Sequence, residues 1–192
     1  LAIRAPSGSN QQNWDFVVVR DRAIIAEFAK INRGIFRLAR WTGYLKVSPG
    51  NPTRQRMMES VQYQTDNFHE IPALIVPCLR GWVPPFPFVV VSSLFGSIYP
   101  AVQNLLLAAR AAGLGATLIT VPIWNQGKAR RLLGLPRNVH PCCMVPLGWP
   151  EKEYRPNRRR PVTEVVHFDR YGQRPQPPVQ TVPGDFLPQG PM

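Results

Sequence analysis

Apolar residues occur along this chain in two kinds of run, and their alternation predicts a protein of helices and strands. Short unbroken apolar runs, which are typical of strands covered on both faces, occur at 15–19, 73–79, 116–121 and 142–147. Apolar residues three and four positions apart predict helices at about 22–41, 54–69, 95–112 and 126–133. The order of these elements predicts an α/β or α+β sandwich of three layers.

Several helix ends are marked by residues that satisfy free backbone groups. Asp21 and Asn125 are predicted N-caps of the helices that follow them. Gly113 stands where a left-handed C-terminal cap is expected, and the helix after Asn125 is predicted to end at Gly134. A last apolar stretch, 162–168, predicts a strand at a sheet edge or across a dimer.

The stretch 5–16 is a polar loop between a helix end and a strand. Pro6 cannot continue a helix, and Gly8 permits backbone angles that are closed to other residues. Ser7, Ser9 and Asn10 place several short donors and acceptors close together. Such a loop suits a flat polar ligand, although a capped turn with no ligand explains it equally well.

The composition indicates one globular domain with a sizeable core. The chain has 192 residues, of which 44% are hydrophobic and 18% charged, and its formal net charge is +12. The arginines are scattered, and only 158–160 form a run, so nucleic-acid binding is not predicted as the main function. An anionic cofactor would account for part of the positive charge.

The three cysteines are interpreted as inert core thiols. Cys78, Cys142 and Cys143 lie in apolar runs, their number is odd, and no Cys-x-x-Cys pair occurs. We therefore predict no metal site. No signal peptide is visible and no apolar run approaches the length of a membrane span, so the expected location is the cytoplasm, with no membrane partner.

The two ends of the chain differ from its middle. Residues 171–192 are rich in Pro and Gln and form a predicted tail, either disordered or lying over a partner subunit, which leaves 1–170 as the domain. The first residues, from Leu1 to Ala5, resemble the last turn of a helix. We expect an N-terminal segment to be missing.

Five motifs in order resemble those of the FMN-dependent nitroreductases over about residues 1–170. The segment Ala5-Pro-Ser-Gly-Ser-Asn-Gln-Gln-Asn-Trp14 is similar to an early loop of that family, with Asn13 in place of a proline. Residues 97–116 are similar to its central helix and Gly-Leu-Gly turn. The C-terminal landmarks are Leu132-Leu-Gly-Leu-Pro136, Val145-Pro-Leu-Gly-Trp-Pro150 and Arg159-Arg-Pro-Val-Thr-Glu-Val-Val166. The family's Arg-Arg-Ser-x-Arg segment, which contacts the phosphate, is not in this sequence.

The resemblance implies an α+β fold, a three-layer α-β-α sandwich of nitroreductase type with a mixed central sheet. It also implies an intertwined homodimer with FMN at the subunit interface. In that dimer, one loop would contact a flavin bound mainly by the partner subunit, through Pro6, Ser7, Gly8 and Asn10.

The resemblance also implies where the flavin ring and phosphate would lie. The segment from Leu118 through Ile119 and Thr120 to Val121 would run along the ring near N5. Arg159 would reach the phosphate, with Arg158 and Arg160 as alternatives of register.

The implied reaction passes two electrons from NAD(P)H through FMN to a small aromatic acceptor such as a nitroaromatic compound or a quinone. Thr120 is the preferred hydroxyl near N5, and Thr117 is the alternative. Thr120 is equally well explained as an ordinary β-branched residue of a strand. Trp82, Phe86 and Phe88 either line the acceptor pocket or pack in a dimer core. Alternative functions within the fold are reductive dehalogenation, breakdown of the flavin, and flavin binding or storage without catalysis.

Overall fold

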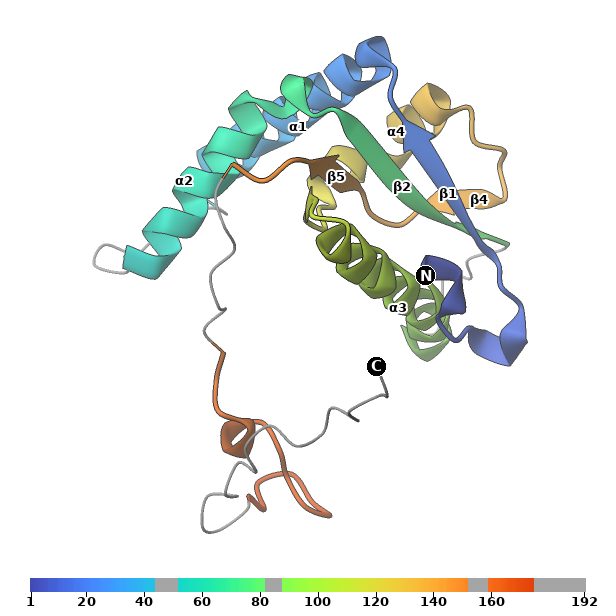
Figure 1. Ribbon diagram of the computed structural model, residues 1–192, viewed down its shortest axis with the longest axis vertical. Coiled ribbons are helices and arrows are strands. Elements are labelled where there is room, and N and C mark those ends of the chain that lie inside the picture. The colour runs from blue at the N-terminus through green and yellow to red at the C-terminus, as the bar shows by residue number, and fades with distance from the viewer. Residues whose placement is uncertain (44–51, 82–87, 152–158, 175–192) are drawn as a thin grey trace, which may run out of the picture. The chain divides into compact units, whose positions relative to one another are not determined.

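The computed structural model describes residues 1–43, 52–81, 88–151 and 159–174, and it divides into two compact units (Figure 1). The first unit, Leu1–Glu151, holds the described strands and the helices α1 to α4. The second, Lys152–Met192, holds a 3-10 helix at Val162–Glu164. Trp82 and Phe86 lie outside the described residues, as does the side chain of Phe88.

Five short strands form the sheet at the centre of the first unit. They are β1 (Trp14–Val19), β2 (Ala73–Arg80), β3 (Gly115–Ala116), β4 (Val139–Pro141) and β5 (Val145–Gly148). Their order is β1-β2-β5-β3, and β4 also pairs with β2. Every ladder between these strands is antiparallel, so the prediction of a mixed sheet is corrected for the described residues.

A helical hairpin explains why β2 runs antiparallel to β1. Helix α1 (Arg22–Trp41) leads away from the sheet, and α2 (Pro52–Asp66) returns beside it (Figure 1). Asn32 Nδ2 donates to Thr65 Oγ1 at 3.4 Å, and Arg40 Nη1 donates to Gln62 Oε1 at 3.0 Å. The chain therefore re-enters the sheet where it left, and Leu74 pairs with Val19.

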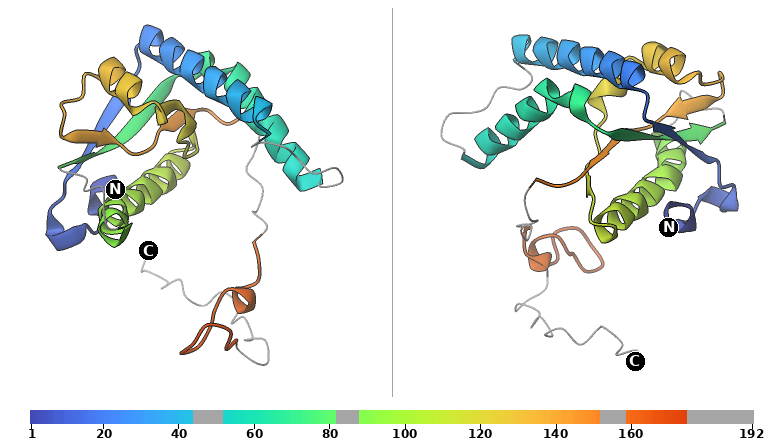
Figure 2. Two further views of the ribbon diagram at one scale, coloured as in Figure 1. Left: turned by 180° about the vertical axis from the view of Figure 1, so that it is seen from behind. Right: turned by 45° about the horizontal axis from the view of Figure 1, so that its top comes forward.

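Helices cover both faces of the sheet, which confirms the predicted three layers (Figure 2). Helix α3 (Phe88–Ala111) lies on one face, and α1 and α4 (Gln126–Leu133) lie on the other. Alternate residues of β2 serve the two cores. One core contains Phe28, Leu74, Val76 and Met144, and the other contains Leu79, Ile98, Val102 and Val145.

The predicted caps are confirmed because they depend on local chemistry. Asp21 Oδ1 accepts the backbone N–H of Ala23 at 2.7 Å, and Asn125 Oδ1 accepts that of Lys128 at 3.0 Å. Gly113 and Gly134 both have a positive φ, of 78° and 63°.

Two predicted strands are shorter or broken. Of the run 116–121, only Ala116 belongs to a strand, β3, and Ile119 forms an isolated bridge with Met144. The chain then enters a 3-10 helix at Val121–Ile123. Pro122, which has no N–H to donate, favours that turn over a longer ladder. The run 142–147 forms β5 only from Val145, and β4 lies before it.

The predicted strand at 162–168 is wrong for the described chain. The N–H groups of Val165 and Val166 both bond to the carbonyl oxygen of Val162, so this segment turns back on itself. A strand needs a neighbouring edge to satisfy its backbone groups. The alternative of a strand across a dimer is not tested.

Helix α3 begins at Phe88, earlier than predicted. Its stretch Val91–Ala111 has a mean hydropathy of 1.2 and is long enough to cross a membrane, so the prediction that no apolar run approaches that length is wrong. This test for a membrane span uses length and composition only, and core helices also pass it. In α3 the side chains of Ile98, Ala101 and Val102 are fully buried against the sheet. On its outer side Leu107 is 58% exposed.

Candidate functional site

The polar loop at residues 6–12 has an uncommon backbone. Ser9, Asn10 and Gln12 have φ values of 51°, 52° and 49°, in the left-handed region that favours glycine. Gly8 is not among the residues with positive φ, so the loop does not use the additional backbone angles that a glycine permits there. The backbone strain is carried by three residues with side chains, and such strain is often found at functional sites.

Two serine hydroxyls hold this loop in shape. Ser7 Oγ accepts the N–H of Gln12 at 3.0 Å, and the carbonyl oxygen of Ser7 accepts the N–H of Asn10 at 3.0 Å. Ser97 Oγ, on α3, accepts the N–H of Gly8 at 3.0 Å. Sequence reasoning missed Ser97, although a hydroxyl one turn before Ala101 on an apolar stripe was a usable signal.

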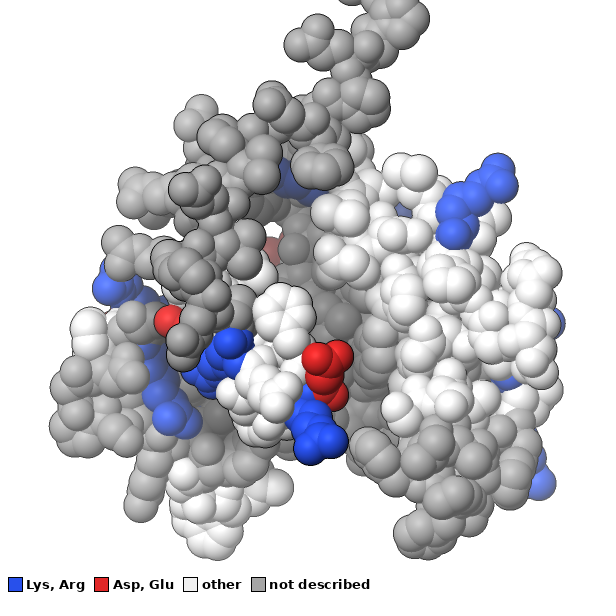
Figure 3. Space-filling model, turned by 90° about the horizontal axis from the view of Figure 1, so that it is seen from below, with Lys and Arg blue, Asp and Glu red and all other residues white. Residues whose placement is uncertain are grey.

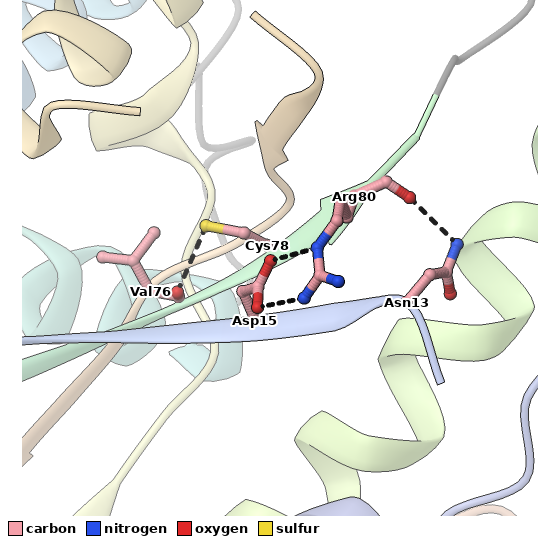
Figure 4. Close-up of polar contacts among 5 residues, drawn as sticks. All are labelled: Asn13, Asp15, Val76, Cys78 and Arg80. Carbon is pink, nitrogen blue, oxygen red and sulfur yellow. Dashed lines mark hydrogen bonds and ion pairs between the residues drawn. The ribbon is translucent and has the colours of Figure 1, made fainter. Parts of the chain in front are cut away.

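The end of the loop is fixed to the sheet by Asn13, Asp15 and Arg80 (Figure 4). Asn13 Nδ2 donates to the carbonyl oxygen of Arg80 at 3.2 Å, and Arg80 Nη2 lies 2.7 Å from Asp15 Oδ1. The hydrogen bond and charge of Asp15 raise the pKa of Arg80. Asn13, which replaces a proline in the motif, therefore holds the start of β1 next to the end of β2.

The segment predicted to face flavin N5 leaves backbone donors available. The N–H of Ile119 donates to Met144 O at 2.9 Å, and Thr120 O accepts the N–H of Ile123 at 3.0 Å. In the described part of the chain, no hydrogen bond uses the N–H of Thr120 or Val121. The first N–H groups of a 3-10 helix have no partner within the helix.

A cavity of about 290 Å³ lies against the chain just before this segment. The end of α2, the chain leading into β2, and the strands β3 and β5 meet there. Its lining residues are Gln64, Asn67, Ile71, Pro72, Gly115, Ala116, Thr117, Pro146, Leu147, Gly148 and Trp149. Trp149 is 78% exposed, so a flat apolar ring surface is open to solvent beside polar amides.

A larger hollow, of about 600 Å³, lies elsewhere on the first unit. It is lined by Ile35, Leu38, Ala39, Thr42, Trp124, Asn125 and Gln126. The polar groups at its edge already have structural roles, since Asn125 caps α4 and Gln126 Nε2 donates to Ile123 O at 3.1 Å. The smaller cavity leads directly into the segment that is predicted to follow the flavin ring, and for that reason it is the candidate for a bound cofactor.

The predicted site residues fall into three separate groups. Pro6, Ser7, Gly8 and Asn10 lie in the loop beside α3, while Leu118, Ile119 and Thr120 follow β3. Arg159 is exposed and belongs to the second unit, as does Arg160, and Arg158 lies outside the described residues. The roles of all these residues remain predictions.

The cysteines are buried, as predicted. Burial raises the pKa of Cys78, Cys142 and Cys143 to about 12 in each case. Cys78 Sγ lies 3.4 Å from the carbonyl oxygen of Val76 (Figure 4). Thiols in this state are poor nucleophiles and poor metal ligands, so they carry no chemistry at the candidate site.

The basic residues are dispersed on the surface. On the face drawn in Figure 3, the described Lys and Arg side chains lie at separate points rather than in one continuous patch. A single patch or stripe is the usual electrostatic footprint of a nucleic-acid-binding surface.

Comparison with known families gives one match over most of the chain. The model of the Nitroreductase family matches residues 1–149. A protein of Archaeoglobus fulgidus, provisionally named NADH dehydrogenase/NAD(P)H nitroreductase, is 29% identical over 154 residues, which are 79% of this chain and 70% of that protein. A 5,6-dimethylbenzimidazole synthase of Rhodospirillum rubrum is 26% identical over 185 residues, covering 92% of this chain and 77% of the synthase.

Solved structures share the fold. An oxidized iodotyrosine deiodinase bound to FMN and 3-iodo-L-tyrosine superposes with a TM-score of 0.63 and 22% identity, over 88% of this chain and 83% of that one. At that identity the likeness establishes the fold alone. It confirms the predicted α+β sandwich.

Proposed function

This chain belongs to the nitroreductase family, and on that premise we propose that it passes two electrons from NAD(P)H through bound FMN to a small aromatic acceptor. A nitroaromatic compound or a quinone is the expected class of acceptor. FMN, when bound, would supply the exchange of two electrons. The protein supplies binding, orientation and electrostatic support.

The observation that carries this proposal is a pair of unused backbone donors, three and four residues after Thr117 at the wall of the smaller cavity. The N–H groups of Thr120 and Val121 are not used within the described chain, and Thr117 lines the cavity. Amide donors of this kind fit an acceptor nitrogen at the edge of a flavin ring. Donation by these backbone groups does not depend on the Thr120 hydroxyl. Either the backbone N–H or the hydroxyl of Thr120 could donate to the flavin ring.

The opening loop fits the polar part of a flavin. Ser7 Oγ accepts from the N–H of Gln12, so the hydroxyl proton of Ser7 remains available for donation. Asn10 Oδ1 accepts from Gln12 Nε2 at 3.1 Å, which leaves the Asn10 amide nitrogen as the donating group. We expect Pro6 and Gly8 to shape the contact surface, and Arg159 to compensate the phosphate charge.

We propose that the enzyme acts as a homodimer. The loop beside α3 is hydrogen-bonded to Ser97, and the segment after β3 is hydrogen-bonded to Met144. The two are thus held by different parts of the fold, which suits a site that two subunits complete together. Leu107 on α3 is 58% exposed, and a second copy would cover it. A cytoplasmic location is retained as a prediction.

A second candidate function changes the acceptor and keeps the fold. The 26% identical relative is named for a synthase, and a solved neighbour is a deiodinase, so similar proteins are not all named as nitroreductases. Reductive dehalogenation, flavin breakdown and flavin storage therefore belong in the test.

The test is an acceptor panel with the protein reconstituted with FMN. Under anaerobic conditions, NADPH or NADH should reduce the bound flavin, and a nitroaromatic compound should reoxidise it. Turnover with halogenated phenols alone, or loss of flavin in oxygen, would favour the second candidate. Flavin that is bound but never reduced by NAD(P)H would identify a storage protein and refute the proposed reaction.

A further inference from the structure

We propose that Ser97 is a positioning residue for the flavin-binding loop, a role that rests on the proposed function. Its hydroxyl on α3 ties Gly8 to the sandwich and thereby sets the position of Ser7 and Asn10, which the site is expected to use. Ser97 itself acts through the loop.

Burial and chemistry both single out this hydroxyl. Ser97 is only 5% exposed, and its neighbours on the buried stripe are Ile98, Ala101 and Val102. A hydroxyl in such a stripe is unfavourable unless it makes a hydrogen bond. Ser97 Oγ accepts the Gly8 N–H at 3.0 Å, across 89 residues of sequence.

The hydrogen bonds within the loop fix its internal shape, and Asn13 ties only its far end to the sheet. The backbone N–H groups of Asn10, Gln11 and Gln12 donate to Ser7 or Gly8, all within six residues. Three left-handed residues store strain in the same segment. The Ser97 bond connects this locally folded unit to a rigid helix, and binding sites depend on such supporting contacts.

Removal of the hydroxyl should therefore shift the loop while the fold is kept. In Ser97→Ala the helix retains a good helix-forming residue and a small side chain. The backbone N–H of Gly8 loses its acceptor, so its hydrogen exchange should speed up by about tenfold or more. The Kd for FMN should rise by about fivefold to tenfold, which is the effect of one hydrogen bond.

The experiment compares the full chain with Ser97→Ala and with Ser92→Ala, an exposed serine on the same helix, as control. Amide exchange at Gly8 is measured without flavin, and FMN affinity by fluorescence titration. We expect Ser92→Ala to match the wild type in both. At saturating FMN, Ser97→Ala should keep the wild-type kcat, because the reacting groups are unchanged.

Each result decides a different part of the proposal. Unchanged Gly8 exchange in Ser97→Ala would overturn the tie itself, whether or not flavin binds. Faster exchange with an unchanged Kd for FMN would overturn the positioning role alone. Failure of the wild type and of Ser92→Ala to bind FMN would refute the proposed function, and the positioning role with it.

Discussion

Gly8→Ala separates the stability of the fold from the binding of a ligand. An added Cβ at Gly8 would meet Ser97 Oγ at 3.6 Å, an ordinary van der Waals contact, and the φ of Gly8 is not in the left-handed region. The folded loop therefore accepts alanine. Because alanine reduces the freedom of the unfolded chain, we expect a gain of about 0.4–1 kcal/mol in the free energy of unfolding. For a chain of this size that corresponds to a rise in Tm of about 1–4 °C.

The same methyl group should weaken FMN binding if the loop backbone packs against the flavin. Overpacking of a close contact costs about 1–3 kcal/mol. The Kd for FMN should then rise by about 5-fold to 150-fold. Thermal unfolding of the apoprotein gives the first quantity, and fluorescence titration with FMN gives the second.

Gly34→Ala is the matched control. Gly34 lies inside α1, and an added Cβ there has no atom within 4 Å. It should raise Tm through helix propensity and leave the Kd for FMN unchanged. Equal Kd values for Gly8→Ala and the wild type would refute the assignment of Gly8 to the flavin contact. A lowered Tm would refute the structural reasoning about the loop.

Two further predictions address the dimer and the thiols. Leu107→Glu should convert the proposed dimer to a monomer, as measured by light scattering. Leu38→Glu is the matched control, because Leu38 is 57% exposed and Leu107 58%, and it should leave the dimer intact. A dimer that survives Leu107→Glu would contradict a subunit interface on α3. Burial raises the pKa of all three thiols to about 12, so the neutral thiols stabilise the fold below the pKa of an unfolded cysteine, and this contribution is lost as pH rises toward 12. A thiol reagent should therefore label none of them at pH 8 in the native protein and all three after denaturation, and rapid native labelling would show that they are not buried.

The parts of the fold that the sequence predicts well are those with local causes. The helix 22–41 is predicted at both ends because Asp21 supplies its cap and its apolar residues repeat at helical spacing. The same holds for Gln126–Leu133 between Asn125 and Gly134. In these cases the residues that decide the structure are neighbours in the chain.

Strands are harder to predict because their extent depends on partners far away. The run 116–121 has a suitable apolar pattern, but β5 offers pairing only for Gly115 and Ala116 before Pro122 turns the chain. The stretch 162–168 also has the composition of a strand and forms a 3-10 helix with turns instead. No pattern within either segment reveals which edge is available.

In the candidate site, too, the sequence predicts the features that have local causes and misses those that depend on distant residues. The motif identified the loop, yet the strained residues are Ser9, Asn10 and Gln12 rather than Gly8, since backbone angles follow from the closed network of hydrogen bonds. Ser97 joins the loop from 89 positions away, a separation that no local pattern spans. The cavity likewise brings together α2, β3 and β5.

The most direct test of the central claim is anaerobic reduction of the FMN-loaded, full-length protein. The account predicts that NADPH or NADH bleaches the visible absorbance of the flavin and that a nitroaromatic compound restores it, with repeated cycles as more donor is added. A protein that cannot be reconstituted with FMN, or whose bound flavin keeps its colour in excess NADPH and NADH, would contradict it.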